Sequence, residues 1–162
     1  MTDRKVVAQS GSVGLAEALG ADEAVVGVIQ AAFDVDADPR PFPMPVHSHT
    51  LTVLEAGDLA GGVSWMPVLH GPQYPCLAWV IGVTLMPEHR GRGVGTVAHR
   101  LLVDHLFAST DLDRVEAETD VDNLAERRVL EKVGFACEGI LRGAQLRGGV
   151  RRDLALYGLL RP

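Results

Sequence analysis

A glycine-rich segment between an apolar stretch and an amphipathic helix constrains the fold more than any other feature of the sequence. Residues 77–85 are apolar and predict a buried strand, while residues 96–107 carry apolar side chains at helical spacing. Between them runs the segment Glu88-His89-Arg90-Gly91-Arg92-Gly93-Val94-Gly95-Thr96. This succession predicts an α/β chain in which a strand passes through a glycine loop directly into a helix.

The glycine-rich segment has the composition of an anion-binding loop. Glycine has no Cβ atom to block a ligand, so several backbone N–H groups can point at one anion, and the following helix adds the positive end of its dipole. Arg90 and Arg92 add positive charge to a chain whose formal net charge is -6. The glycines match neither the G-x-G-x-x-G fingerprint nor the Walker motif. The segment therefore predicts a pyrophosphate site of another kind.

The N-terminal half of the chain predicts short strands, one helix and a loop. Residues 6–8 indicate a strand followed by a loop, and Asp22 is a plausible N-cap for a helix that reaches residue 33. Prolines at every second position of residues 39–45 exclude a helix or a central strand and predict a surface loop. Residues 50–68 predict an antiparallel hairpin that turns at Gly57-Asp58.

The C-terminal half predicts a strand, a helix and a long hairpin. Residues 114–119 alternate apolar and polar side chains, as a strand with one polar face does. Asn123 and Glu126 have the spacing of a capping box, and Gly134 marks the C-terminal end of the helix that follows. Residues 137–159 predict a hairpin with a glycine-rich turn.

Length and composition indicate one domain over residues 1–162. With 47% apolar and 22% charged residues, the chain can bury a core without disulfides or metals. Its acidic isoelectric point, near 5.4, argues against a nucleic-acid partner. The longest apolar stretch, residues 76–86, is too short to span a membrane, and no apolar core of signal-peptide length opens the chain. Because Cys76 and Cys137 belong to no metal-binding pattern, we expect a cytoplasmic protein with reduced thiols.

The glycine loop and the motifs downstream of it resemble one acyltransferase family. Arg90-x-x-Gly93-x-Gly95, placed after Val83-Thr84-Leu85, looks like the acetyl-CoA loop of the GNAT N-acetyltransferases. The downstream motifs, which are similar to the RimJ/RimL-like branch of that family, are Asp122-Asn123-x-Ala125-x-x-Arg128-Val129-Leu130-Glu131-Lys132-x-Gly134-Phe135, Glu138-Gly139-x-Leu141-Arg142 and Arg152-Asp153-Leu154-x-Leu156-Tyr157. The resemblance covers about residues 61–160, whereas residues 1–45 lack the N-terminal strand pattern usual in the branch.

The resemblance implies a single GNAT-fold domain of the α/β (α+β) class. Its mixed, mostly antiparallel, twisted sheet would be flanked by helices and splayed beside residues 77–85, where the pantetheine arm of acetyl-CoA pairs like another strand. It also implies acetyl transfer to a primary amine by direct attack on the thioester, and it makes a homodimer plausible. The implied cofactor-binding residues are Val83, Thr84, Leu85, Arg90, Gly91, Arg92, Gly93, Val94, Gly95, Thr96 and Asn123.

The candidate catalytic residues are Glu116, Glu118, Glu126 and Tyr157, and two departures from the branch concern proton transfer. Glu126 replaces a Ser that is assigned to protonate the leaving thiolate, and a carboxylate is a poor donor at neutral pH. The alternative role of Glu126 is to complete the capping box. Gln145 replaces the acidic residue proposed as the base, so Glu116 or Glu118 would act instead, through water, unless both belong to an ordinary solvated face. Tyr157 is either an acid or a packed, hydrogen-bonded side chain.

The sequence leaves three questions open: which amine accepts the acyl group, which acyl-CoA donates it, and whether the protein is an enzyme. The acceptor is either a small-molecule amine, such as an amino acid, polyamine or antibiotic, or a protein N-terminal α-amine. The donor is acetyl-CoA or a longer acyl-CoA such as succinyl-CoA, whose carboxylate Arg40 or Arg142 could hold. The departures at the acid and base positions also leave open a non-catalytic module that binds acyl-CoA or a protein partner. His47 and His49 have no visible third ligand, so we predict no metal site.

Overall fold

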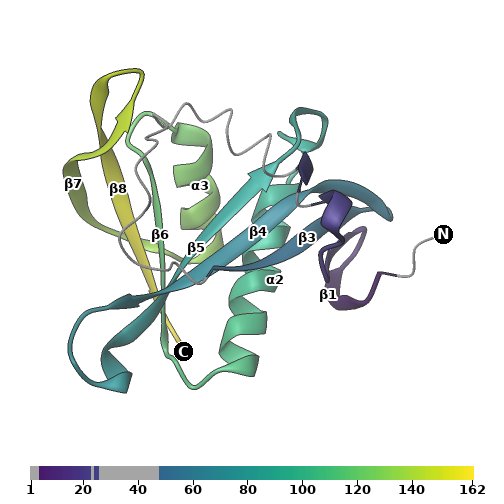
Figure 1. Cartoon of the computed structure of the whole chain (residues 1–162), viewed down its shortest axis with the longest axis horizontal. Helices are drawn as coiled ribbons and strands as arrows, with labels where there is room; N and C mark the ends of the chain where they lie inside the picture. Colours follow the sequence, from purple (N-terminus) through teal and green to yellow (C-terminus); the bar gives the residue numbers. More distant parts are fainter. Residues whose placement is uncertain (1–3, 23, 26–47) are drawn as a thin grey trace.

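One curved sheet organises the molecule (Figure 1). The computed structural model describes residues 4–22, 24–25 and 48–162, and their eight strands follow the order β1-β2-β3-β4-β5-β6-β8-β7. The strands are β1 (Val6–Ser10), β2 (Val13–Ala16), β3 (His49–Glu55), β4 (Asp58–Leu69), β5 (Leu77–Leu85), β6 (Arg114–Asp120), β7 (Ala136–Arg147) and β8 (Val150–Leu160). The two long helices of the described residues are α2 (Val94–Ser109) and α3 (Leu124–Val133), with short 3-10 turns at Tyr74–Cys76 and Pro87–His89. Residues 20–22 and 24–25 are also helical. The expected mixed, mostly antiparallel sheet flanked by helices is confirmed.

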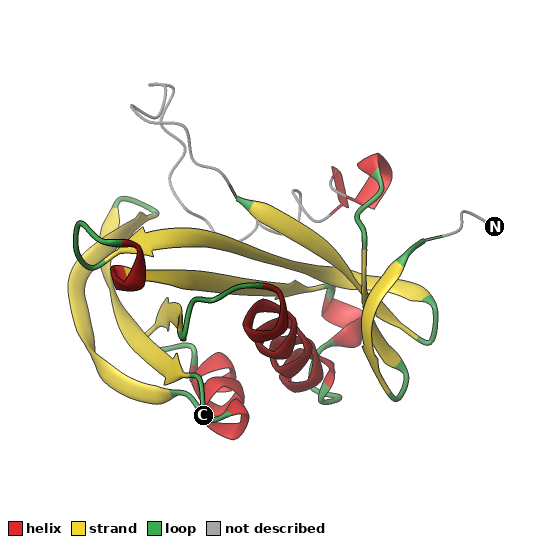
Figure 2. Ribbon diagram, turned by 90° about the horizontal axis from the view of Figure 1, so that it is seen from below, coloured by secondary structure: helices red, strands yellow, loops and turns green. Residues whose placement is uncertain are grey.

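Both long helices cover the same face of the sheet, on the inside of its curve (Figure 2). α2 contributes Ala98 and Leu102 to a core that also contains Val53, Ile81 and Val115 of the central strands. Because side chains alternate along a strand, the neighbouring residues of these strands point to the opposite face. None of the helices among the described residues is long and apolar enough to cross a membrane.

Most C-terminal elements lie where the sequence predicts them. β5 has the predicted bounds, β6 extends the predicted strand by one residue, and β7 and β8 form the predicted hairpin. α3 ends at Gly134, which adopts the left-handed conformation with φ of 114°. α2 begins at Val94 rather than at the predicted Thr96, because Gly93 is its N-cap, so Gly95 is already helical.

Three N-terminal predictions need correction. Residues 13–16 form β2 rather than a loop, because their apolar side chains are buried where β2 pairs with β3. Asp22 is not an N-cap: it is buried within the helical residues and accepts hydrogen bonds from Arg4 and Thr52. The β3–β4 turn is Ala56-Gly57, one residue earlier than predicted, because both turn residues have positive φ, 53° and 91°. The predicted proline loop and His47 lie outside the described residues.

The β5–β6 seam positions the candidate site. Among the strand pairings of the described residues, only β5 and β6 run parallel, and they pair over three residues, Trp79 to Ile81 with Val115 to Ala117. Beyond these pairs β5 continues along β4, and β6 continues along β8. The sheet therefore splays at the C-terminal ends of β5 and β6, beside the strand where the resemblance implied it.

Candidate active site

The gap between the C-terminal halves of β5 and β6 is the centre of the candidate site. Residues 83–85 form its β5 edge, and residues 118–120 form its β6 edge. Each strand leads into a helix, α2 and α3 respectively, so two helix N-termini lie at this end of the sheet. Ligands of α/β proteins bind outside the carboxyl ends of strands, where the connections part. This gap is therefore the expected ligand site.

The glycine loop at the N-terminus of α2 fits an anionic ligand. Gly91 and Gly93 have φ of 72° and 86°, and a Cβ atom on either would meet nothing within 4 Å, so the space above the backbone is open. α2 has no side-chain N-cap and no acidic residue in its first turn. Its first N–H groups lack intrahelical acceptors. The loop thus leaves free donors and a positive dipole end where a pyrophosphate would lie.

The two arginines of the loop contact the protein itself. Arg90 Nε donates a hydrogen bond to the Leu85 carbonyl at 2.9 Å, which holds the loop against the end of β5. Arg92 donates to Glu55 Oε2 at 2.5 Å, and His89 Nδ1 lies 2.6 Å from the same oxygen. Glu55 is the last residue of β3, so this carboxylate ties the loop to a distant strand. The sequence of the loop does not indicate that Glu55 contacts it.

Three carboxylates follow one face of β6. Glu116, Glu118 and Asp120 alternate with the core residues Val115 and Ala117, so they point away from α2 and α3. Glu116 is 2% exposed and accepts hydrogen bonds from Arg114 Nε, at 2.6 Å, while His70 Nε2 lies 2.5 Å from the same oxygen. Burial and the two contacts at Oε1 therefore hold the carboxylate of Glu116 in place within the protein.

Glu118 is the middle carboxylate of this row, and its position distinguishes it from the other two. No described residue forms an ion pair or side-chain hydrogen bond with it, and it follows directly after the last β5–β6 pair, Ile81 with Ala117. Partial burial, and to a smaller extent the charge of Glu116, raise the pKa of Glu118. A partnerless carboxylate with a raised pKa at the edge of a gap is a suitable general base.

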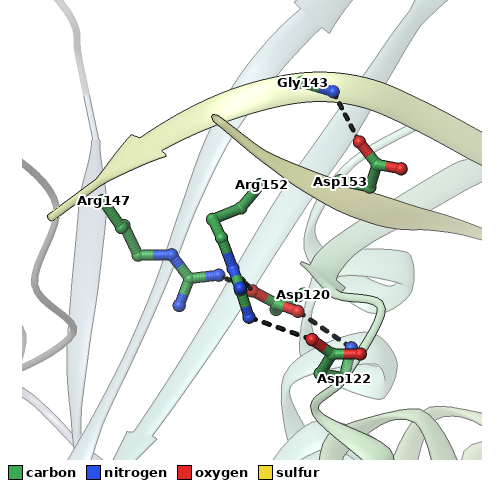
Figure 3. Close-up of polar contacts among 6 residues, drawn as sticks. All are labelled: Asp120, Asp122, Gly143, Arg147, Arg152 and Asp153. Atoms are coloured by element: carbon green, nitrogen blue, oxygen red, sulfur yellow. Dashed lines mark hydrogen bonds and ion pairs between the residues drawn. The ribbon is translucent and has the colours of Figure 1, made fainter. Parts of the chain in front are cut away.

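The third carboxylate, Asp120, holds the β7–β8 hairpin beside the gap (Figure 3). It is 8% exposed and pairs with Arg147 and, at 3.1 Å, with Arg152; Arg152 also reaches Asp122 at 3.0 Å. The hairpin bends at Gly143, whose φ is 59° and whose N–H donates to Asp153 at 2.7 Å. Burial raises the pKa of Asp120, but the Asp122 N–H and the two arginines outweigh it and lower the pKa overall.

Replacing Asp120 with Asn is expected to destabilise the fold by about 2 kcal/mol at pH 7, since two partly buried guanidinium groups lose the negatively charged carboxylate that pairs with both of them. The lowered pKa means that this contribution is present above the unfolded pKa, about 3.9, and is lost as the pH falls through the folded value. Chemical denaturation at pH 7 and near pH 3 measures both effects. The control, Asp122→Asn, removes an exposed partner and should cost less than about 1 kcal/mol. Equal losses in the two variants would contradict the assignment.

The start of α3 differs from the predicted capping box. Asn123 caps the helix, because its side-chain oxygen accepts the Glu126 N–H at 3.2 Å. The reciprocal bond is absent: the Asn123 N–H donates to the Asp120 carbonyl, and Glu126 Oε1 lies 2.9 Å from His99 Nε2 of α2. The capping role of the Glu126 side chain is therefore wrong. The sequence carries no signal for this pair, because its two residues lie in different helices.

The remaining predicted residues have neighbours other than Glu118. Tyr157 is 0% exposed on the helix side of the sheet, and its hydroxyl accepts from Arg127 Nε at 3.1 Å and donates to Glu131 at 3.2 Å, as the packing alternative predicts. Gln145 lies opposite Arg152 in the β7–β8 hairpin. His49 stacks on Trp65 with ring centroids 5.2 Å apart.

Three comparisons with known proteins all match acetyltransferases. The model of the acetyltransferase (GNAT) domain matches residues 43–136. The probable N-acetyltransferase YjcK of Bacillus subtilis is 38% identical over 104 residues, which are 64% of this chain and 56% of YjcK. RimJ of Mycobacterium smegmatis, solved with CoA-disulfide, shares the fold with a TM-score of 0.74 at 23% identity, over 97% of this chain and 85% of RimJ.

A polyamine-modifying enzyme has the same fold. A variant of the spermidine N-acetyltransferase SpeG from Vibrio cholerae superposes with a TM-score of 0.77 at 18% identity, over 94% of this chain and 95% of SpeG. The chain spans about half to three fifths of the length of the curated relatives it matches. The family model covers more than half of the chain and includes the glycine loop and α3. The chain belongs to the GNAT acetyltransferase family.

Proposed function

We propose that this protein acetylates a primary amine with acetyl-CoA as the donor, by direct attack and without a covalent enzyme intermediate. Bound acetyl-CoA would supply an activated acetyl thioester. The N–H groups of residues 91–96 would hold its pyrophosphate, residues 83–85 would pair with its pantetheine arm, and Asn123 would contact the arm from α3. The open backbone at Gly91 and Gly93 and the uncapped N-terminus of α2 support this assignment.

Glu118 carries the catalytic part of the proposal. An amine attacks only after losing its proton, so a base must stand where amine and thioester meet. Glu118 lies where β5 and β6 part, points to the face opposite the helices, and has no partner among the described residues. In our proposal its carboxylate takes the proton of the attacking ammonium, directly or through one water. Glu116 then holds the strand and helps to raise the pKa of Glu118.

In our proposal the acceptor is a primary amine, either on a protein N-terminus or on a small molecule. The resemblance to the RimJ/RimL-like branch favours a protein N-terminal α-amine, whereas the unusual N-terminal residues favour a small-molecule amine. Spermidine enters the comparison because SpeG shares the fold. Release of free CoA from acetyl-CoA, measured with a panel of amino acids, polyamines and short peptides, distinguishes the classes. Succinyl-CoA in a parallel series tests the longer donor.

Acetyl-CoA should raise the melting temperature of the wild-type protein, because a ligand that binds only the folded state stabilises it. Light scattering of the same samples measures the molar mass of the protein in solution, which tests the expected homodimer. No shift at millimolar acetyl-CoA, succinyl-CoA and CoA would exclude the donor site. A shift with no release of CoA for any amine would favour a non-catalytic binding module.

Replacing Gly93 with Val is expected to abolish the thermal shift caused by acetyl-CoA. The φ of 86° disfavours any side chain, and a branched one would fill the open space above the loop. Gly11 is the matched control, since it also has a positive φ, 57°, and open space but lies in the β1–β2 turn. Gly11→Val should lose comparable stability and keep the shift. A Gly93→Val protein that still responds to acetyl-CoA would contradict the pyrophosphate assignment.

A further inference from the structure

The tip of the β7–β8 hairpin extends past the end of β6, where the gap opens. β8 pairs with β6 only from Leu154 onwards, opposite Asp120, so its first residues, 150–153, have no partner on β6. The end of β7, residues 145–147, pairs with this extension. The tip therefore lies beyond the C-terminal end of the strand that carries Glu118, the proposed base.

Two arginines of this tip are held at the row of carboxylates on β6. Arg147 and Arg152 both contact the carboxylate of Asp120, which follows Glu118 by two residues (Figure 3). Residues two apart on a strand point to the same face, and their Cα atoms are about 6.5–7 Å apart. Arg147 is thus anchored at the side chain next to the proposed base on the same face of the sheet.

Arg147 has more hydrogen-bond donors than its contacts use. A guanidinium group has five N–H donors. Among the residues that the structure describes, only Asp120 accepts from it, through Nη2. Its Nε is buried, and within the described part of the chain it is the one buried side-chain nitrogen or oxygen without a hydrogen-bond partner. The side chain as a whole is 20% exposed, so it is not sealed from solvent. An unpaired buried N–H costs stability, and an acceptor atom supplied by a ligand would remove that cost.

The charge of the hairpin favours an anionic ligand. Residues 142–153 contain four arginines and one aspartate, which give a net charge of +3 in a chain whose net charge is -6. The carboxylates of Asp120 and Asp122 offset part of this charge. The contact of Arg151 with a backbone carbonyl offsets none of it. The tip therefore attracts an anion to the end of the gap.

We propose that Arg147 binds a carboxylate of the acceptor, so that the acceptor is a free amino acid. The inference rests on the proposed function and narrows its acceptor classes. A planar guanidinium matches a carboxylate in charge and in shape. With its amine at Glu118 and its carboxylate at Arg147, the acceptor is held at both ends beside the thioester. A polyamine has no carboxylate, and a protein N-terminus has an amide in its place, so neither would use Arg147.

The spacing of the two groups predicts a short amino acid. An α-amino acid with one hydrogen bond at its nitrogen and one at its carboxylate spans about 9 Å. This span suits a base and an arginine that are anchored at neighbouring positions on one face of β6, about 6.5–7 Å apart along the strand. We therefore expect one or two carbons between the nitrogen and the carboxyl group, and slower acetylation of longer ω-amino acids. Arg147 keeps its proton and its charge throughout.

The first test measures binding and needs no turnover. N-acetylated amino acids and the matching N-acetylated amino acid amides differ only at the carboxylate, and neither has an amine whose ionisation could interfere. In the presence of CoA, the acids should raise the melting temperature of the wild type more than the amides do. In Arg147→Gln this difference should vanish. Arg151→Gln, on the same hairpin, is the matched control and should keep the difference.

The second test measures turnover and cancels the difference in basicity between the two amines. The ratio of kcat/KM for an amino acid to kcat/KM for its amide is compared between the wild type and Arg147→Gln. We expect the substitution to lower this ratio about 30- to 100-fold, with the KM for acetyl-CoA within about twofold. Arg147→Lys keeps the charge without the fork and should recover part of the ratio. A merely structural contact with Asp120 would slow both reactions equally and leave the ratio unchanged.

The outcomes distinguish the inference from the proposed function. A wild type that acetylates no amine overturns the proposed function, and the binding test then decides alone whether Arg147 holds a carboxylate. A wild type that binds acids and amides equally overturns the inference, and so does an unchanged kcat/KM ratio in Arg147→Gln. A preference for succinyl-CoA that Arg147→Gln removes would place the carboxylate on the donor and overturn it as well. If Arg147→Gln does not fold, Arg147→Lys takes its place in both tests.

Discussion

Replacing Glu118 with Gln is expected to lower kcat about 100- to 1,000-fold without disturbing the fold, as the removal of a general base does. Gln has the same shape but cannot take a proton from the attacking amine. Because Glu118 pairs with no described residue, little stability depends on its charge. Release of CoA under saturating acetyl-CoA measures the effect, and circular dichroism with thermal melting checks the fold.

The raised pKa of Glu118 fixes the sign of two pH effects. An acid with a raised folded pKa is ionised at a cost to the folded state, so stability falls as the pH rises from the unfolded pKa, about 4.3, through the folded value. Glu118→Gln removes this cost and should melt at or slightly above the wild-type temperature at pH 7. In the wild type, kcat/KM should fall as the pH drops through the folded pKa, and the variant should lack this limb.

Glu116→Gln is the matched control for Glu118→Gln on the same strand. It leaves Arg114 and His70 without their buried carboxylate, so it should lower the melting temperature markedly. Its effect on kcat should be the smaller of the two. The opposite pattern, in which Glu116→Gln abolishes turnover and Glu118→Gln does not, would show that Glu116 and not Glu118 is the base.

Replacing Gly61 with Ala is expected to destabilise the protein by about 3 kcal/mol or more. A Cβ atom at this position would lie 2.1 Å from the Thr84 carbonyl oxygen and 2.9 Å from Leu85 Cα, both of which are backbone atoms that cannot rotate away. β4 would have to separate from β5 where Gly61 pairs with Leu85. Because that part of β5 is also the edge of the gap, we expect the thermal shift with acetyl-CoA to disappear as well.

Gly139→Ala is the control for Gly61→Ala. Gly139 also lies in a strand, β7, but a Cβ atom there would meet nothing within 4 Å. Its replacement should leave the free energy of unfolding within about 0.5 kcal/mol of the wild type, as surface substitutions usually do. Urea denaturation of the two variants compares them directly. Similar losses at both positions would show that the close approach of β4 and β5 is not what requires glycine.

The sequence predicted those parts of the structure that depend on neighbouring residues. The apolar run of β5, the glycines that follow it and the helical spacing of α2 lie within one short segment, and together they placed the glycine loop correctly at a helix N-terminus. β2 escaped prediction because its four residues include a glycine and show no alternation. Its strand conformation is decided by pairing with β3, which lies more than thirty residues away along the chain.

The candidate site could be predicted only in part, because its polar pairs join distant segments. The periodicity of residues 114–119 placed Glu116 and Glu118 on one face but could not tell which of them has partners. His70, which directly follows β4, and Arg114 contact Glu116, and these contacts depend on the register of the folded sheet. The His99–Glu126 pair likewise requires α2 and α3 to lie side by side. A local capping rule therefore assigned Glu126 to the wrong partner.

The three-residue seam between β5 and β6 has a mechanical consequence. Strands β1 to β5 form one antiparallel body, and β6, β8 and β7 form another, each with far more extensive pairing inside than between them. Beyond these three pairs, the two bodies are held together by the hydrophobic core that both of them share with the helices. An extended ligand arm that pairs along the free edge of β5 would widen the junction and couple them. Hydrogen exchange should then slow on binding even in β7, at the outer edge of the second body, where no ligand atom needs to touch.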